Sequence, residues 1–314
     1  MDLEKIIKEH KPNIGESSLK AYISNLKILH NLVKGNKDIK SLNYLLDYDK
    51  IMNLIKDKAR TTIKNYLVAI VVALQHDEDY EAAHKKYYAK MLELQNEVLD
   101  NYEHQEKNEK QEKNWINHED ILKLLKKLRG IIKPLLEKPV IKLNVKDKIL
   151  IQQVLLLYLY SGKSFAPIRN DFDNMKVFRK DPKSDTENYL VLNKTNSYFV
   201  LNKFKTDKRG QQTIKWSDKL LKGLINDWLN ITKSDYLLVN PSENTPMTAN
   251  GISKNLVKLF NAYTDKNVSS SLLRTIYITH KYKDNNLSIK EKKKLGQEML
   301  HSSKMADEVY NKID

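Results

Sequence analysis

The spacing of apolar residues predicts helices over most of the first hundred residues. The predicted helices cover residues 18–33, 62–74 and 81–99. Apolar side chains recur at helical spacing in the first two, and the third is long and mostly polar. Ser17 and Ser18 are N-cap candidates for the first helix, and Gly35 is a plausible stop after it. The second helix is predicted to open at Thr61 and Thr62.

A change of composition marks a boundary after these helices. Residues 101–114, NYEHQEKNEKQEKN, contain one aromatic and no aliphatic residue. This composition is typical of an exposed linker or a frayed helix end. Apolar content returns at Trp115, and helical patterns follow over 119–136 and 146–161. The sequence therefore predicts a helical domain over 1–100 and a second domain over 115–314.

Alternating β-prone residues are confined to one stretch of the second domain. Three strands are predicted at residues 189–192, 198–201 and 212–216. Turn-like segments separate them, and the chain from Ser217 onward has helical patterning again. The predicted fold class is mainly α, with a helical N-terminal domain and an α-rich second domain that holds a small three-stranded antiparallel β insert.

Composition narrows the possible function classes. The 314 residues include 55 Lys+Arg against 40 Asp+Glu, for a formal net charge of +15, and no cysteine. Such an excess favours polyanions, although a lysine-rich proteome produces the same bias. The longest apolar run, Ile149–Tyr160, contains Gln152 and Gln153, so it is expected to be a buried helix rather than a membrane span. The N-terminus does not resemble a signal peptide, and an intracellular location with the target DNA is expected.

Several segments resemble cofactor-binding motifs but lack a residue that the motif requires. A phosphate-binding loop ending at Gly162 and Lys163 needs a glycine five positions earlier, where Leu157 stands. Asp171 and Asp173 form a carboxylate pair without a third partner, which is more typical of a solvated turn than of a metal site. The eight histidines show no metal-ligand spacing. The sequence thus predicts no metal, no cofactor and no nucleotide.

A set of basic and hydroxyl groups remains in the second domain. In chain order these are Arg169, Lys205, Arg274, His301 and Tyr310. Each alone has an ordinary explanation, such as a surface charge, a solvated turn or a tyrosine that packs on the core. Their order and spacing are more specific than any one of them, because Tyr310 follows His301 by nine residues and Arg169 follows a predicted buried helix.

In this order the chain resembles the tyrosine recombinase (integrase) family. That family carries an Arg after a buried helix, a Lys in a β-hairpin, a His-x-x-Arg box, a His or Trp, and a Tyr nine residues further on. The Pro-x-Arg-x-Asp context of Arg169 and the Lys205-Thr206 pair look like members encoded by viruses and mobile elements. The resemblance covers nearly the whole chain and implies site-specific DNA recombination or integration.

The resemblance implies a role for each of these groups. Tyr310 would be the nucleophile that forms a covalent 3′-phosphotyrosine, which conserves bond energy and needs no ATP. Arg169 and Arg274 would stabilise the charge on the phosphate oxygens in the transition state. Lys205 would protonate the leaving 5′-oxygen, with Lys203 and Lys208 as nearby rivals.

Further groups have weaker implied roles. His301 would hydrogen-bond the scissile phosphate, and Asp171 would orient Arg169 or a neighbour. The helical first domain resembles the family's core-binding domain, so the partner would be double-stranded DNA, bound by a homo-oligomer (a tetramer). The expected DNA contacts are Ser18, Lys20, Thr61, Thr62, Lys64, Lys203, Lys208 and Arg209.

The chain departs from the family pattern in three places. Ser271 stands where the first His of the His-x-x-Arg box is expected, and it cannot act as a base at neutral pH. The usual Leu-Gly-His is Met299-Leu300-His301, without its Gly. Four residues follow Tyr310, so the C-terminal helix that many members exchange is expected to be absent. Nine steps of uninterrupted helix would put His301 and Tyr310 on opposite faces, so a helix break is predicted at Ser302-Ser303.

Two alternatives stay open at the level of sequence. A type IB topoisomerase uses a similar set of groups to relax DNA as a monomer, and the short C-terminus favours it mildly. A non-catalytic DNA-binding protein that keeps the fold is supported by Ser271. The retained arginines, lysine and tyrosine favour an enzyme, because a pure binder needs charge but not that set.

Overall fold

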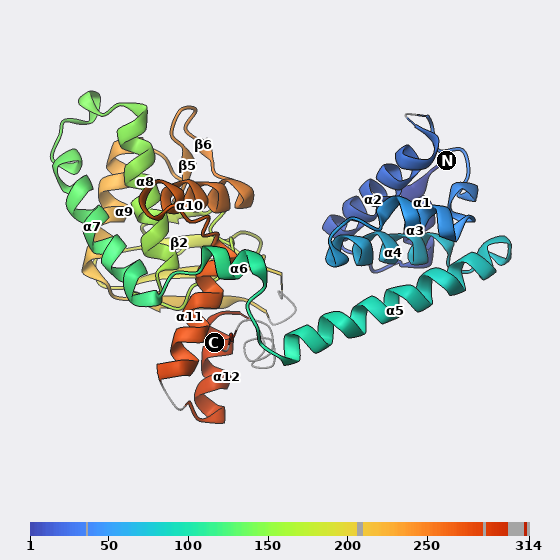
Figure 1. Cartoon of the computed structure of the whole chain (residues 1–314). Coiled ribbons are helices and arrows are strands. Elements are labelled where there is room, and N and C mark those ends of the chain that lie inside the picture. Colours follow the sequence, from blue (N-terminus) through green and yellow to red (C-terminus); the bar gives the residue numbers. More distant parts are fainter. Residues whose placement is uncertain (36, 206–209, 285–286, 301–310, 313–314) are drawn as a thin grey trace. The chain divides into compact units, whose positions relative to one another are not determined.

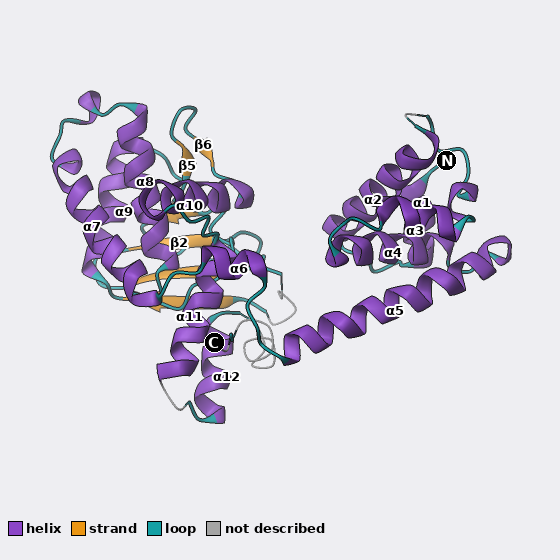
Figure 2. Cartoon of the chain, viewed as in Figure 1, coloured by secondary structure: helices purple, strands orange, loops and turns teal. Residues whose placement is uncertain are grey.

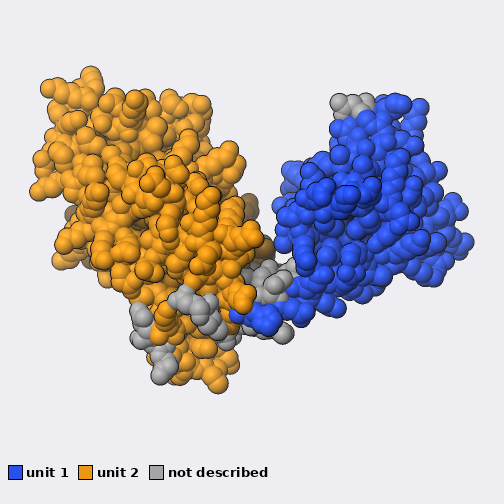
Figure 3. All heavy atoms as spheres, viewed as in Figure 1, with its two compact units in different colours: residues 1–104 blue, residues 105–314 orange. Residues whose placement is uncertain are grey.

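The structure is a computed structural model that describes residues 1–35, 37–205, 210–284, 287–300 and 311–312. The chain divides into two compact units, residues 1–104 and residues 105–314 (Figure 3). Helices dominate both units, so the predicted mainly α fold is confirmed (Figure 2). Within the described ranges, no helix has the length and apolar content needed to cross a bilayer.

Unit 1 is a helical bundle built around one apolar helix. Its helices are α1 Leu3–His10, α2 Glu16–Lys34, α3 Tyr48–Ile55, α4 Arg60–Leu74 and α5 Glu81–Glu103, with 3₁₀ turns at Asn43–Leu45 and Glu78–Tyr80 (Figure 1). Helix α4 packs against α1, α2 and α5. Leu67 and Ile70 on α4 are fully buried, as is Leu26 on α2. A helix that is apolar on nearly all sides belongs in a core, which explains its central position.

The starts of α2 and α4 differ from the predicted N-caps. Gly15 occupies the N-cap position of α2, so Ser17 and Ser18 lie inside its first turn. Helix α4 likewise begins at Arg60, before Thr61 and Thr62. Hydroxyl residues are also tolerated in a first turn, and composition alone cannot fix a helix end to within one or two residues.

The predicted linker is helical at both of its ends. Helix α5 extends to Glu103, and α6 spans Glu109–Asn114 with a capping box between Asn108 and Gln111. Asn114 is buried, and its Oδ1 accepts a hydrogen bond of 2.7 Å from the backbone N–H of Asn267. A polar side chain therefore anchors α6 to the rest of unit 2, which the absence of aliphatic residues could not reveal.

Unit 2 is organised around helix α8. Its helices are α7 His118–Leu136, α8 Val145–Tyr160, α9 Lys219–Thr232, α10 Ala249–Thr264, α11 Ser270–Asp284 and α12 Ile289–Glu298, with a 3₁₀ turn at Val140–Lys142. Helix α8 packs against α7, α9, α10 and α11, and every residue from Ile151 to Tyr160 is buried. The predicted buried helix over Ile149–Tyr160 is confirmed.

A small sheet lies beside these helices. It has the order β1 Lys176–Phe178, β2 Tyr189–Leu192, β3 Ser197–Leu201 and β4 Gln212–Trp216. Strands β2, β3 and β4 are the predicted antiparallel strands. The description as a three-stranded insert was incomplete, because β1 pairs in parallel with β2, Lys176 opposite Tyr189. Three half-buried residues give too short a pattern to predict a strand. A second, two-stranded ribbon joins β5 Val239–Asn240 and β6 Thr245–Pro246.

The two faces of the sheet are buried in different clusters. Leu190, Phe199 and Leu201 point into the main core of unit 2 with the side chains of α8. Tyr189 and Val200 belong to a small separate cluster on the other face. The core face fixes the register of the strands, and with it the position of the β3–β4 connection that carries Lys205.

Candidate active site

Helix α8 ends in a loop that holds Arg169. The hydroxyl of the buried Tyr160, the last residue of α8, lies 3.0 Å from the carbonyl oxygen of Arg169 and 3.0 Å from Oδ1 of Asn170. The Asn170 amide in turn donates to the carbonyl of Ala249, at 2.8 Å. These bonds fix the loop backbone against α8 and α10, which sets the direction of the half-buried Arg169 side chain.

The same loop begins with a turn that only glycine fits. Gly162 has φ of +72°, and a Cβ built on it would lie 2.3 Å from ring carbons of Tyr277 on α11. Ser161 and Gly162 therefore belong to a packed turn between α8 and α11.

Arg274 carries its charge into the protein interior. The residue lies on α11 and is only 3% exposed. Its Nε donates to the carbonyl of Pro167 at 3.2 Å, and its Nη2 lies 3.4 Å from the carbonyl of Met299. A buried guanidinium is costly unless it is hydrogen-bonded, so these carbonyls hold α11, the Arg169 loop and the end of α12 together.

The two arginines meet at one short segment. Nη1 of Arg169 donates to the carbonyl of Leu300 at 3.1 Å, and Arg274 approaches the carbonyl of Met299, the preceding residue. Two guanidiniums from distant parts of the sequence therefore contact consecutive carbonyls directly before His301. Such paired, fixed cations are the arrangement that binds a phosphate by bidentate hydrogen bonds.

Leu300 has a backbone conformation that favours glycine. Its φ is +59°, and its N–H donates to the carbonyl of Gln297 at 3.0 Å, so it closes the C-terminus of α12 in the left-handed region. Its side chain is 3% exposed and packs in the main core of unit 2. The missing Gly of the family pattern thus falls at a position where the backbone requires a positive φ.

Asp171 lies close to both arginines. Burial raises the pKa of its carboxyl from the ordinary value of 3.8 to about 6, although the neighbouring guanidiniums of Arg169 and Arg274 act in the opposite direction. Within the described residues, its buried Oδ2 has no hydrogen-bond partner. Burial also raises the pKa of Asp173. The carboxyl of Asp171 therefore sits beside the arginines without a hydrogen bond that would fix it as their partner.

Asn188, which belongs to no recognisable sequence motif, connects the β3–β4 region to this loop. Its amide donates to the carbonyl of Asp171 at 3.2 Å and to the carbonyl of Lys203 at 2.7 Å. Its Oδ1 accepts from the Lys203 N–H at 2.8 Å. Phe204 is buried beyond it, and Lys205 is exposed. Lys205 therefore follows an anchored segment that is tied to the Arg169 loop.

An open cavity lies between this loop, β4 and the end of α12. Its volume is about 480 Å³. Lys163, Ser164, Lys215, Tyr277 and Leu300 are among the residues that line it. Leu300 is also the residue whose carbonyl accepts from Arg169, so one hydrogen bond connects the wall of this solvent-open recess to the arginine pair.

Ser271 is exposed at the start of α11, unlike the buried Arg274 three residues later. His301 and Tyr310 lie outside the described residues, as do Lys208, Arg209 and the helix break expected at Ser302-Ser303. Residues 301–310 are flanked by Leu300 and by Asn311 and Lys312. The backbone N–H of Lys312 donates to Oγ1 of Thr279 on α11 at 3.0 Å. Both flanks are therefore fixed to the arginine-bearing part of unit 2.

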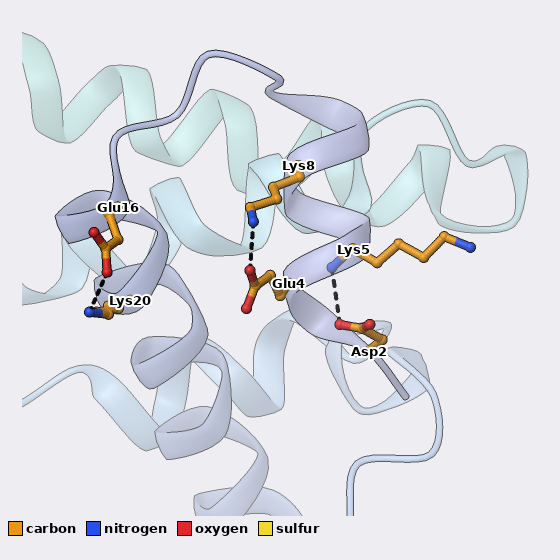
Figure 4. Close-up of polar contacts among 6 residues, drawn as sticks. All are labelled: Asp2, Glu4, Lys5, Lys8, Glu16 and Lys20. Atoms are coloured by element: carbon orange, nitrogen blue, oxygen red, sulfur yellow. Dashed lines mark hydrogen bonds and ion pairs between the residues drawn. The ribbon is translucent and has the colours of Figure 1, made fainter.

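The expected DNA contacts of unit 1 lie near the starts of α2 and α4. Ser18, Lys20 and Thr61 are exposed, and Thr62 and Lys64 are half-buried. Lys20 is paired with Glu16 at 2.6 Å (Figure 4). An ion pair between two fully exposed side chains is weak, so it does not prevent Lys20 from meeting a phosphate. The Asn25 amide, which donates to the Asn65 carbonyl at 3.2 Å, joins α2 to α4.

Comparisons with known proteins gave one structural likeness. Neither the protein-family models nor the curated proteins include a match to this chain. Among solved structures, the crystal structure of XerA recombinase aligns with 99% of this chain and 93% of its own, at 12% sequence identity and a TM-score of 0.41. A likeness of this size leaves the chemistry of the chain to be argued from its own residues.

The conformation of Leu300 predicts an unusual order of stability among its variants. Leu300→Ala loses buried surface and keeps a side chain at positive φ, whereas Leu300→Gly loses the surface but removes that strain. We expect the Gly variant to be more stable than the Ala variant by about 1 kcal/mol. Urea unfolding followed by tryptophan fluorescence measures this, because Trp115, Trp216 and Trp228 all lie in unit 2.

Leu295 supplies the matched control for this pair. It is also buried, but lies within α12, where glycine costs about 0.5–1 kcal/mol relative to alanine. At this position the Ala variant should be the more stable one. The same order of stability at both positions would contradict the strained conformation assigned to Leu300.

The raised pKa of Asp171 predicts a pH dependence of stability. Between 3.8 and about 6 the folded chain holds a proton that the unfolded chain has released. Stability from this group is therefore fully present below 3.8 and is lost as the pH rises to about 6. Between these two pH values the wild type should lose about 2 kcal/mol of unfolding free energy because of this group. Asp171→Asn should not show this loss, and urea unfolding at each pH measures both proteins. Parallel pH profiles for the wild type and the variant would rule out the burial of a carboxylate here.

Proposed function

We propose that this chain cuts and rejoins DNA strands at specific sites through a covalent 3′-phosphotyrosine at Tyr310. The observation that carries the proposal is the convergence of Arg169 and Arg274 on the consecutive carbonyls of Leu300 and Met299. The proposed partner is double-stranded DNA, and the proposed active assembly is a homo-tetramer on it. Unit 1 would supply backbone contacts through the starts of α2 and α4.

The chemistry proposed for the arginines follows from their hydrogen-bonding capacity. In attack on a phosphodiester, negative charge builds up on the non-bridging oxygens. Two guanidiniums with fixed geometry stabilise this charge without reorganising during the reaction, and loss of one such donor costs about 3–4 kcal/mol of transition-state stabilisation. The scissile phosphate would take the place of the Leu300 and Met299 carbonyls, because hydrogen bonds to a charged acceptor are about twice as strong as those to a neutral one.

Lys205 is the proposed general acid. Its exposed side chain follows a segment that Asn188 ties to the Arg169 loop. An ammonium on a flexible stem can reach the leaving 5′-oxygen and release a proton to it, which a guanidinium cannot do at neutral pH. Asn188 is then a positioning residue for Lys205.

A second candidate function has its own support. Ser271 is exposed, and Arg274 is 3% exposed with its guanidinium hydrogen-bonded to backbone carbonyls. Both features suit a DNA-binding protein that keeps the fold without strand transfer. In that case Arg274 would serve the stability of unit 2 and would not contact DNA.

The covalent intermediate gives the first test. With nicked suicide substrates drawn from pooled genomic DNA, the wild-type chain should produce a DNA-linked protein band on a denaturing gel. Tyr310→Phe should lose the band and keep its affinity for DNA within a few-fold, since a single hydroxyl contributes little to a large electrostatic interface. Tyr236→Phe, a half-buried tyrosine in unit 2, serves as the control and should keep the band.

The outcomes of this test separate the candidate functions and check the role of Tyr310. Tight, salt-sensitive binding without a band from the wild type would favour the non-catalytic binder. A band that forms on any DNA, together with relaxation of supercoils, would favour a type IB topoisomerase. Loss of DNA binding in Tyr310→Phe would contradict the assigned role of the tyrosine.

The role of Lys205 predicts a chemical rescue. Lys205→Ala should cut ordinary DNA at least about 100-fold more slowly, which is the low end of general-acid contributions. A 5′-bridging phosphorothiolate substrate has a leaving group that needs no protonation, so cleavage by Lys205→Ala should return to near the wild-type rate. Lys203→Ala is the matched control and should show neither defect nor rescue. Rescue of Lys203→Ala instead would assign the acid to that residue.

A further inference from the structure

A cluster of two imidazoles and a carboxylate lies where α7 meets α11. His118 and Glu119 begin α7, and His280 lies on α11. One ligand atom from each of the three lies within 4.8 Å of the others. Nδ1 of His280 is 3.1 Å from Oε1 of Glu119, and the rings of His118 and His280 are stacked with centroids 4.4 Å apart.

The hydrogen bonding of His118 fixes which nitrogen can act as a ligand. Its Nε2 lies 2.8 Å from the carbonyl of Ser161, and a carbonyl only accepts, so Nε2 carries the proton. Nδ1 then carries no proton, and its lone pair is able to coordinate a metal ion. This nitrogen is buried, the residue is 7% exposed, and no described group hydrogen-bonds to Nδ1. A buried acceptor without a hydrogen bond is destabilising, so a ligand that filled it would be stabilising.

The surroundings of His118 match those of a metal-binding histidine. Histidine ligands commonly donate their second ring nitrogen to a backbone carbonyl, which orients the ring and sets its tautomer. Two imidazole nitrogens and one carboxylate oxygen form a donor set suited to Zn²⁺ and its neighbours rather than to Ca²⁺ or Mg²⁺.

We propose that His118, Glu119 and His280 bind one divalent transition-metal ion, such as Zn²⁺, between α7 and α11. Water would fill the fourth position of a tetrahedral site. Donor atoms around Zn²⁺ lie about 3.4 Å apart, so the cluster must contract slightly on binding. The His280 ring must also turn out of the stack, because nearly parallel rings cannot direct their in-plane lone pairs at one ion. Its partly exposed position allows this turn.

The site would act on the same part of unit 2 as the arginine pair. Ser161, which binds His118, precedes the Gly162 turn and the Arg169 loop, and α11 carries Arg274 as well as His280. The ion would therefore link α7 to α11 next to the turn that leads to Arg169. Metal binding at this site is independent of the proposed strand transfer, and it can be measured in the absence of DNA.

The test uses the full chain without an affinity tag, stripped with chelator and dialysed. Titration with Co²⁺ should produce the visible absorption of a tetrahedral site that saturates at one equivalent, and Zn²⁺ should displace it. His280→Gln and Glu119→Gln should each weaken Zn²⁺ binding at least about tenfold in calorimetry. His104→Gln removes an exposed histidine elsewhere and should bind like the wild type.

Tryptophan fluorescence of each variant without metal shows whether unit 2 keeps its fold, which separates lost ligands from lost structure. Absence of saturable Co²⁺ absorption in the wild type overturns the proposal. Equal Zn²⁺ affinity in the wild type, His280→Gln and Glu119→Gln overturns it too, because the ion would then bind elsewhere.

Discussion

A buried positive charge organises unit 2. Arg274 is 3% exposed, and its guanidinium is hydrogen-bonded by carbonyls of Pro167 and Met299, which belong to two separate segments. Removing the partner of a buried charge typically costs about 3–5 kcal/mol. The loop after α8 and the end of α12 must therefore stay in place around α11 for the domain to be stable. A shift of either segment would weaken a hydrogen bond of the buried guanidinium.

The packing of α8 makes this arrangement possible. Because α8 is buried on all sides, its last residue, Tyr160, is a rigid point to which the Arg169 loop is hydrogen-bonded. The loop then approaches α11 so closely that Gly162 lies against Tyr277. A larger residue at 162 would push the loop away from α11 and draw Pro167 from Arg274. The hydrophobic core and the arginine pair are thus connected through one turn.

The elements that follow from local patterning could be predicted from the sequence, and those set by tertiary contacts could not. The all-apolar stretch of α8 and the alternation of β2 to β4 are encoded residue by residue, so their positions were predictable. Strand β1 forms because Lys176–Phe178 finds β2 beside it, and nothing in three residues encodes that partner. Helix starts at Glu16 and Arg60 were missed by one or two residues for a local reason, because hydroxyl residues occur both as caps and inside a first turn.

The candidate site shows the same division. The order of Arg169, Lys205 and Arg274 was visible in the sequence, but their supports were not. Asn188 is a lone asparagine before a strand, and its bonds to Asp171 and Lys203 exist only in the folded chain. His118 and His280 are far apart in the sequence, so no spacing motif could pair them. The positive φ of Leu300 was also hidden, because leucine is the wrong residue to signal it.

The contacts of the arginines have a consequence for the proposed chemistry. The guanidiniums that would bind the scissile phosphate are already hydrogen-bonded to the carbonyls of Leu300 and Met299. A phosphate that takes these donors must release the carbonyls, and with them the strained end of α12. By linkage, a change that loosens the end of α12 would favour phosphate binding, and phosphate binding would loosen the end of α12 by the same free energy.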